Sequence, residues 1–313
     1  FIIKKPNTKY WNSLLENPLS PLTFRSIQGL YSPGSTFKMI VALAALKHNL
    51  IDPKKTTFCE GKIEFGDRFY HCWKTKGHGN MNLENAIKES CDVYFYELSK
   101  KVGINKISSM AFELGLGQTY DIGIENEKMG IIPSKKWKKE NLNESWYAGE
   151  TLNTAIGQGY ALSTPLQLAV MIARFASNGK KITPTLFKRN EKVKFEEIKS
   201  LTQYGNIINN ALFKVVNEQK GTAYKSKSND YLYSGKTGTS QVKRITQAER
   251  ESEEFRKKNI EWKDKDHALF VGYFPSKNPK YAISVVIEHG GSGASTAAPI
   301  VKRTFDYIMK LKF

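Results

Sequence analysis

No apolar run in this sequence of 313 residues approaches the roughly 18 residues that a membrane-spanning helix needs. The longest run, residues 39–46, suits a short helix of a globular domain, and we expect that helix to be amphipathic. The first residues, Phe1 to Lys5, lack the pattern of a signal peptide. The sequence therefore predicts either a cytoplasmic protein or one whose export and anchoring segments lie outside this chain.

Cysteine is also scarce, with three in the chain at Cys59, Cys72 and Cys91. An odd number cannot pair completely, and so few cysteines exclude a small disulfide-held scaffold. The sequence has no zinc-finger pair, no aromatic stacking platform and no arginine-rich recognition helix, so we expect no nucleic-acid partner. The net charge of +18 would suit an anionic partner, but a lysine-rich solvated surface gives the same charge, so the charge does not select a function.

The composition belongs to a globular domain, with 40% hydrophobic and 12% aromatic residues. Between Pro33 and about Lys180 the pattern is mostly helical. One helix is predicted over residues 85–101, before Gly103, and another over residues 164–176, where Thr164-Pro165 is a helix-start signal. The first half of the chain is therefore expected to be mainly helical.

The second half changes character. Its β-rich runs are residues 231–242, 267–274 and 281–288. A turn at residues 275–279 would join the last two as a hairpin, and residues 298–313 form a closing helix. The highly charged stretch 244–265 is interpreted as an exposed insertion. These elements predict a mixed α/β domain built on an antiparallel sheet flanked by helices.

A first candidate for chemistry is Ser35 with Lys38, just after Pro33-Gly34 at a predicted helix start. Residues three apart share one helix face. A serine hydroxyl becomes a nucleophile only beside a base, and a lysine serves as one where burial or a nearby cation lowers its pKa. Free N–H groups at the helix start would favour a developing oxyanion. Taken alone, the pair is equally an N-cap serine beside a solvated lysine.

Two later patterns add to it. Ser90-Cys91-Asp92 lies in the helical region and, alone, is an ordinary helix start with an acid in its first turn. Lys236-Thr237-Gly238-Thr239 lies on a predicted strand, where glycine permits close approach and the cation and hydroxyls suit a carboxylate. Alone, that segment is a kinked hairpin strand.

Together and in this order, the three patterns resemble the signature of penicillin-binding proteins and serine β-lactamases. The likeness covers nearly the whole chain and includes residues 29–35, the run that leads into the nucleophile Ser35. Ala155-Ile156-Gly157-Gln158-Gly159 and residues 164–169 look like transpeptidases more than β-lactamases. Residues 90–96 and Gly77-His78-Gly79 look most like the monofunctional class B enzymes of side-wall elongation, penicillin-binding protein 2.

The resemblance implies a role for each matched residue. Ser35 would attack the carbonyl between the last two D-alanines of a stem peptide, Lys38 would take its proton, and Ser90 would help pass that proton to the leaving amine. Backbone N–H groups of Ser35 and Thr239 would form the oxyanion hole. The segment Lys236-Thr237-Gly238-Thr239 would hold the terminal carboxylate. An amine from a second stem peptide would complete the cross-link, and β-lactams would trap Ser35.

The resemblance also implies architecture and surroundings. The fold would be the serine β-lactamase and D,D-transpeptidase type, a single domain over residues 1–313. Its mostly helical subdomain would cover roughly residues 50–160, and its sheet and last helix roughly residues 210–313. The enzyme would act at the periplasmic face of the inner membrane, anchored by a segment outside this chain. A membrane polymerase and a scaffold of the elongation complex would be its partners, and catalysis would need no cofactor.

One residue departs from the family pattern. Asp92 occupies the place where most members have asparagine, although the acid is a variant found in elongation-type enzymes. A carboxylate beside Lys38 would favour the charged ammonium and weaken the base. Lys236 would offset part of that effect.

All three cysteines fall close together in sequence with one histidine among them, in the order Cys59, Cys72, His78, Cys91. Three cysteines and a histidine form a known tetrahedral set for structural zinc, although the spacing is looser than in a zinc finger. Alternatively, Cys59 and Cys72 form a disulfide, or Cys91 is a small core residue. The resemblance favours zinc near the active site, since penicillin-binding protein 2 enzymes have a similar arrangement.

Two other functions share the fold. A β-lactamase needs a base that activates water on the acyl-enzyme, and the sequence has no motif for one. A penicillin sensor would be acylated stably without cross-linking peptides.

Overall fold

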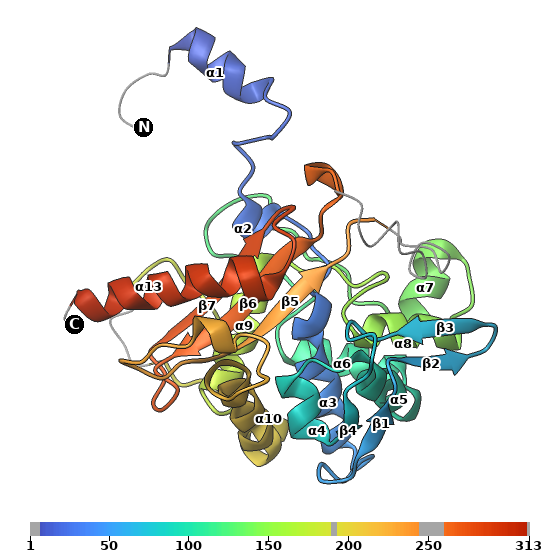
Figure 1. Cartoon of the computed structure of the whole chain (residues 1–313). Helices are drawn as coiled ribbons and strands as arrows, with labels where there is room; N and C mark the ends of the chain where they lie inside the picture. Colours follow the sequence, from blue (N-terminus) through green and yellow to red (C-terminus); the bar gives the residue numbers. More distant parts are fainter. Residues whose placement is uncertain (1–6, 189–192, 244–259, 312–313) are drawn as a thin grey trace.

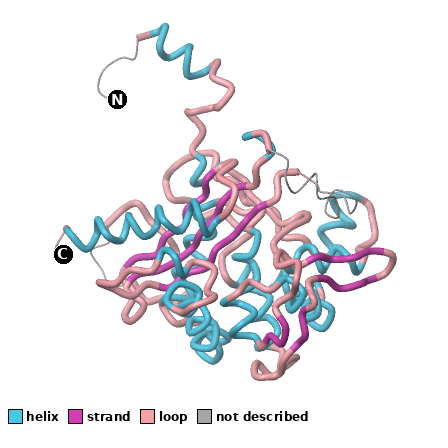
Figure 2. The backbone as a smooth tube through the Cα atoms, in the orientation of Figure 1, coloured by secondary structure: helices cyan, strands magenta, loops and turns pink. Residues whose placement is uncertain are grey.

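The computed structural model describes residues 7–188, 193–243 and 260–311, and its strands fall into two separate groups (Figure 2). The larger group is an antiparallel sheet in the order β5 (Ser234–Ser240), β6 (His267–Phe274) and β7 (Tyr281–Ile287). Lys236 of β5 pairs with Val271 of β6, which in turn pairs with Ser284 of β7. The predicted antiparallel sheet and its hairpin are therefore confirmed.

Helices cover both faces of this sheet. The closing helix α13 (Ala298–Lys310) crosses one face, while α9 (Pro165–Ala176) and α10 (Lys199–Asn217) pack against the other (Figure 1). Because both faces are covered, all residues of β6 after His267 are buried. Thr164 and Gln167 form a capping box at the start of α9, which confirms the predicted helix start. Sequence inspection missed α10, the long helix behind β5.

The apolar run after Ser35 forms α3 (Lys38–Lys47) in the middle of the domain. Every residue from Lys38 to Leu46 is buried. The expectation of an amphipathic helix is therefore wrong: other elements surround α3, so its apolar residues point in all directions. A helix this deeply packed is a rigid base for the residues at its start.

The helix expected over residues 85–101 is two helices, α4 (Leu83–Lys88) and α5 (Asp92–Val102). The chain breaks between them because Ser90 has a left-handed backbone with φ of 57°. The end before Gly103 is as predicted, with that glycine at φ of 75° after α5. The helical region continues with α6 (Ile104–Glu113), α7 (Lys135–Leu142) and α8 (Ala148–Ala155).

The second group of strands lies within the region that was expected to be mostly helical. It consists of two antiparallel pairs, β1 (Thr57–Cys59) with β4 (Gly79–Met81) and β2 (Lys62–Phe65) with β3 (Arg68–His71). These strands are short, three or four residues each, so they leave little period-two pattern to recognise.

The remaining elements are peripheral or short. At the amino-terminal end, α1 (Thr8–Leu15) extends away from the body and is followed by α2 (Arg25–Gln28) (Figure 1). The single-turn helices are η1 (Gly34–Phe37), η2 (Tyr224–Ser226), η3 (Trp262–Asp264) and η4 (Gly293–Ala297). None of the helices in the described ranges is both long and apolar enough to traverse a bilayer. Most of the charged stretch 244–265 lies outside the described residues.

Candidate active site and cysteine–histidine cluster

Ser35 lies in η1, the tight turn that leads into α3. This turn is fixed by the Gly34 backbone, which has φ of 54° and donates from its N–H to the carbonyl of Gly157 at 3.0 Å. A side chain on Gly157 would clash with the Gly34 backbone. Glycine at both positions therefore lets the loop after α8 pack directly against the nucleophile turn.

Lys38, one helical turn further, is completely buried and makes three hydrogen bonds. Its Nζ donates to Ser90 O at 2.9 Å, to Ser90 Oγ at 3.1 Å and to Asp92 Oδ1 at 2.7 Å. These bonds use all three protons of an ammonium group. Lys38 must therefore give up a proton, or exchange one of these bonds, before it can act as a base toward Ser35.

The middle motif lies between two lysines. Ser90 Oγ accepts hydrogen bonds from Lys38 Nζ and from Lys236 Nζ, the second at 2.9 Å. Lys236 Nζ also donates to the carbonyl of Thr237 at 3.0 Å. Ser90 thus connects the start of α3 with β5, and its hydroxyl can carry a proton between them.

Burial sets the electrostatics here. It is the largest cause of the lowered pKa of Lys236, and the neighbouring charge of Lys38 lowers that pKa further. Burial also raises the pKa of Asp92, against the attraction of Lys38, with which Asp92 forms a buried ion pair. The acid at this position therefore serves as the counter-ion of Lys38, the arrangement that the sequence led us to expect.

Ser35 and Ser90 open into a cleft of about 350 Å³. One wall is hydroxyl-rich, with Thr237 and Thr239 of β5 beside Thr222. The hydroxyls of Thr222 and Thr237 are hydrogen bonded at 2.7 Å. Gly238 lies between the two strand threonines, and a side chain there would press against Thr36 and Pro33 of the nucleophile turn. This wall offers hydroxyl donors to an anionic group.

Lys236 does not line the cleft with these threonines. Its side chain is completely buried behind the wall, with its ammonium directed to Ser90. Any effect of Lys236 on a carboxylate in the cleft therefore acts through charge across a low-dielectric layer. The structure thus brings Ser35, Ser90 and the strand threonines to one cleft, while Lys38 lies buried behind it in contact with Ser90.

A second, aromatic wall of the cleft was missed from the sequence. It is formed by the aromatic side chains of His71, Trp73 and Tyr96, and Gln158 lines the cleft as well. The Gln158 side chain donates to the carbonyl of Thr239 at 3.3 Å. The position of Trp73 directly after Cys72 was the one local signal that pointed to this wall.

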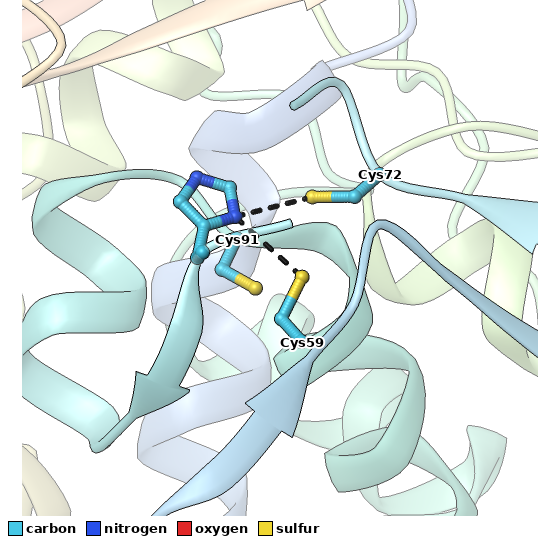
Figure 3. A group of neighbouring side chains, drawn as sticks. Cys59, Cys72 and Cys91 are labelled. Atoms are coloured by element: carbon cyan, nitrogen blue, oxygen red, sulfur yellow. Dashed lines mark hydrogen bonds between the residues drawn. The ribbon is translucent and has the colours of Figure 1, made fainter. Parts of the chain in front are cut away.

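The three cysteines and His78 meet in one cluster beside this wall. Their ligand atoms lie within 4.8 Å of one another, and Figure 3 shows the sulfurs of Cys59, Cys72 and Cys91 converging. The Nδ1 of His78 lies 3.6 Å from Cys59 Sγ and 3.4 Å from Cys72 Sγ. All three cysteines are free thiols, so the structure does not contain the alternative disulfide between Cys59 and Cys72.

The donor set fits zinc chemically. The pKa of Cys72 is lowered, chiefly because the Cys91 thiol donates to it, and His78 lowers it further. The pKa of Cys91 is raised by that same hydrogen bond and by burial. Three cysteine sulfurs and a ring nitrogen that converge on one point match a tetrahedral Cys₃His site. Cys91 is also the residue between Ser90 and Asp92, so the cluster adjoins the middle motif.

Comparison with known proteins gives a family match over most of the chain. The family model described as "Penicillin binding protein transpeptidase domain" matches residues 3–306. The peptidoglycan D,D-transpeptidase MrdA of Haemophilus influenzae is 34% identical over 312 residues, covering 96% of this chain and 47% of that protein. MrdA of Acinetobacter baumannii is 34% identical over 314 residues, covering 96% of this chain and 46% of that protein. The chain thus spans about half the length of the curated relatives it matches.

Solved structures agree with the fold. Penicillin-binding protein 2 from Helicobacter pylori, in complex with MreC, matches with a TM-score of 0.87 and 32% identity over 98% of this chain and 54% of that chain. Pseudomonas aeruginosa PBP2 in complex with WCK 5153 matches with a TM-score of 0.81 and 34% identity. The match covers 96% of this chain and 63% of that chain. A chain of a peptidoglycan synthase complex that coordinates polymerization and crosslinking matches with a TM-score of 0.78 and 31% identity. The match covers 96% of this chain and 50% of that chain.

Proposed function

Since this chain belongs to the penicillin-binding protein transpeptidase family, we propose that it is a peptidoglycan D,D-transpeptidase of cell-wall elongation. One observation carries the proposal: Ser90 Oγ is hydrogen bonded to both Lys38 and Lys236, at the edge of the cleft that contains Ser35. Three motifs far apart in sequence therefore meet where a serine nucleophile, its base and a proton relay are needed.

The proposed reaction begins with Ser35. Its hydroxyl oxygen attacks the carbonyl between the last two D-alanines of a stem peptide, and its proton passes to Lys38. Ser90, within hydrogen-bond distance of Lys38, passes a proton to the departing amine as the carbon–nitrogen bond breaks. Backbone N–H groups of Ser35 and Thr239 stabilise the oxyanion. An amine of a second stem peptide then displaces Ser35 and forms the cross-link.

Substrate placement uses the hydroxyl-rich wall. Thr237 and Thr239 offer donors to the terminal carboxylate, and Gly238 permits the close approach of strand and nucleophile turn. Lys236 contributes its charge from behind this wall. When Lys236 is charged, its cation opposes the effect of Asp92 on Lys38, and because burial lowers the pKa of Lys236 this opposition is only partial.

The relatives suggest the setting. We assign residues 1–313 to a single transpeptidase domain, with a mostly helical part over roughly residues 50–160 and the sheet with its last helix over roughly residues 210–313. Because the matched relatives are about twice as long, we place this domain in a longer protein, anchored at the periplasmic face of the inner membrane. A scaffold such as MreC and a membrane polymerase are the proposed partners, on the likeness to two complexes.

Zinc is the proposed occupant of the cysteine–histidine cluster. Cys59, Cys72, Cys91 and His78 would hold it, and the metal would act structurally, replacing several hydrogen bonds with four strong ligand bonds. The ligands come from β1, the residue after β3, the loop before β4 and the N-cap of α5, so one ion would tie these short elements together.

The test is intact-protein mass after addition of benzylpenicillin, followed over hours for wild type and Ser35→Ala. A persistent one-to-one adduct on wild type that is absent from Ser35→Ala supports Ser35 as the nucleophile. Formation of a cross-linked product from a stem-peptide donor and an amine acceptor then separates a transpeptidase from a sensor. Rapid loss of the adduct with consumption of the drug would instead identify a β-lactamase, and the absence of any adduct would overturn the proposal.

A further inference from the structure

Trp73 is the first residue after Cys72, and its side chain stands at the edge of the cleft. Its side chain is 60% exposed, although tryptophan is usually well buried. Its ring meets His78 edge-on, with 5.4 Å between ring centroids. A ring that leaves most of its surface in water gains little from hydrophobic burial, so its polar contacts account for its placement.

Those polar contacts reach both ends of the middle motif. The indole Nε1 donates to two consecutive carbonyls, Glu89 O and Ser90 O, each at 3.1 Å. The backbone N–H of Trp73 donates to Asp92 Oδ2 at 2.9 Å. A single residue outside the motif therefore contacts the peptide before Ser90, the carbonyl of Ser90 and the side chain of Asp92.

The backbone of Ser90 needs such support. Its φ of 57° is unfavourable for a residue with a side chain, and conformations of this kind persist only where the surroundings hold them. The Ser90 carbonyl accepts from Lys38 Nζ at 2.9 Å as well as from Trp73. These two donors fix the peptide group that follows Ser90, and thereby the direction in which Oγ projects between Lys38 and Lys236.

We propose that Trp73 is a positioning residue for Ser90: its indole N–H holds the turn between α4 and α5 so that Ser90 Oγ lies between the two lysines and delivers a proton to the leaving amine. This inference rests on the proposed function, because the position of Ser90 matters only if Ser90 passes that proton. Trp73 itself touches none of the reacting atoms.

The proposal predicts a dependence on the leaving group. When Ser35 acylates on an amide or a β-lactam, the carbon–nitrogen bond breaks and the nitrogen must receive a proton. When it acylates on a thiol ester, the carbon–sulfur bond breaks and the thiolate departs without one, because a thiol has a pKa of about 8.5. A displaced Ser90 slows the first reaction and spares the second. Damage to the cleft as a whole slows both.

The experiment compares Trp73→Phe with wild type, because phenylalanine keeps a ring beside His78 and lacks the N–H. Trp262→Phe is the matched control, since Trp262 is 56% exposed and its ring packs on His289 instead. Acylation rates of Ser35 are measured with two substrates. One is benzylpenicillin, and the other is a thiol ester whose leaving group is the thiol analogue of D-lactate. Thermal midpoint and zinc content are measured on the same samples.

For Trp73→Phe we expect benzylpenicillin acylation to fall about 10- to 100-fold, thiol ester acylation to stay within about 2-fold, and midpoint and zinc content to be unchanged. Trp262→Phe should match wild type throughout. Unchanged benzylpenicillin acylation in Trp73→Phe overturns the proposal. So does an equal loss with both substrates, or a loss accompanied by a lower midpoint and missing zinc. If wild type itself forms no acyl-enzyme, the proposed function fails instead.

Discussion

The buried ion pair between Lys38 and Asp92 offers a quantitative test of the site. The two charges are 2.7 Å apart, with the side chain of Lys38 wholly inaccessible and that of Asp92 11% exposed. Lys38→Met keeps a long unbranched side chain but removes the cation. Asp92 is then left with a buried carboxylate whose remaining hydrogen bond comes from the backbone of Trp73.

Removal of one partner from a buried pair costs about 3–5 kcal/mol, because the other charge stays desolvated. The buried ammonium of Lys236 attracts Asp92 and should compensate in part, so we expect the lower end, about 3 kcal/mol. At roughly 2 °C for each kcal/mol in a large domain, the thermal midpoint should fall by about 6 °C. In the double variant Lys38→Met/Asp92→Asn neither charge is present, and we expect most of that loss to be recovered.

Calorimetric midpoints of wild type, both single variants and the double variant form the test, with benzylpenicillin acylation measured beside them. Acylation should stay abolished in the double variant, because the base is missing. Lys302→Met is the control: its pair with Asp306 is 2.8 Å long, but both side chains are about one-third exposed, so it should cost at most about 1 kcal/mol. Purely additive losses in the double variant would refute the reasoning.

Three other substitutions probe the cluster, the nucleophile turn and the ion pair between Arg25 and Glu288. Cys72→Ser should lower zinc from near one per chain to near none in metal analysis and decrease the thermal midpoint; unchanged zinc content would contradict the proposed site. Gly157→Ala should slow acylation by at least about 10-fold, because its new methyl group meets the Gly34 backbone. Gly66→Ala, also at positive φ but with open space around it, should leave acylation unchanged, and equal effects would refute the argument. Burial alone would raise the pKa of Glu288, but hydrogen bonds from Tyr31 and Arg25 outweigh burial and lower that pKa. The charged Glu288 side chain therefore stabilises the fold above its unfolded pKa of about 4.3, and this stabilisation is lost as the pH falls. Glu288→Gln should therefore reduce the midpoint by no more than about 2 °C at pH 7, and this deficit should shrink as the pH falls below about 4.3; a deficit that grows toward acid would show the reverse sign.

Much of the candidate site could be predicted because its residues stand in local patterns. Ser35 and Lys38 are one helical turn apart, so their proximity follows from helix geometry alone. The strand that carries Thr237 and Thr239 was predicted for a similar reason, since alternate residues of a strand share a face. The sheet hairpin and the start of α9 likewise depend on turn and capping residues that act within a few positions.

Other features depend on distant contacts and left no local signal. The break at Ser90 occurs inside a stretch with continuous helical character, and the side chains that donate to the Ser90 carbonyl, Lys38 and Trp73, come from other elements. The apolar run of α3 was expected to be amphipathic. All sides of this helix are buried instead, because helices and strands from elsewhere in the chain surround it. Thr222 lines the cleft beside Thr237, to which its hydroxyl is hydrogen bonded, and no local pattern marks it.

The sequence by itself determined the chemical inventory and the family: a serine with its lysine, a second serine, a lysine and threonine strand, and three cysteines near a histidine. Only the tertiary structure decided how these groups face one another. Cys59 meets His78 because β1 pairs with β4, placing Cys59 opposite Gly79. The Lys236 side chain is directed to Ser90 and not into the cleft. Because it is buried behind β5, its ammonium donates to the hydroxyl of Ser90 and to a backbone carbonyl. Residue type is encoded locally, whereas burial and mutual orientation are properties of the packed chain.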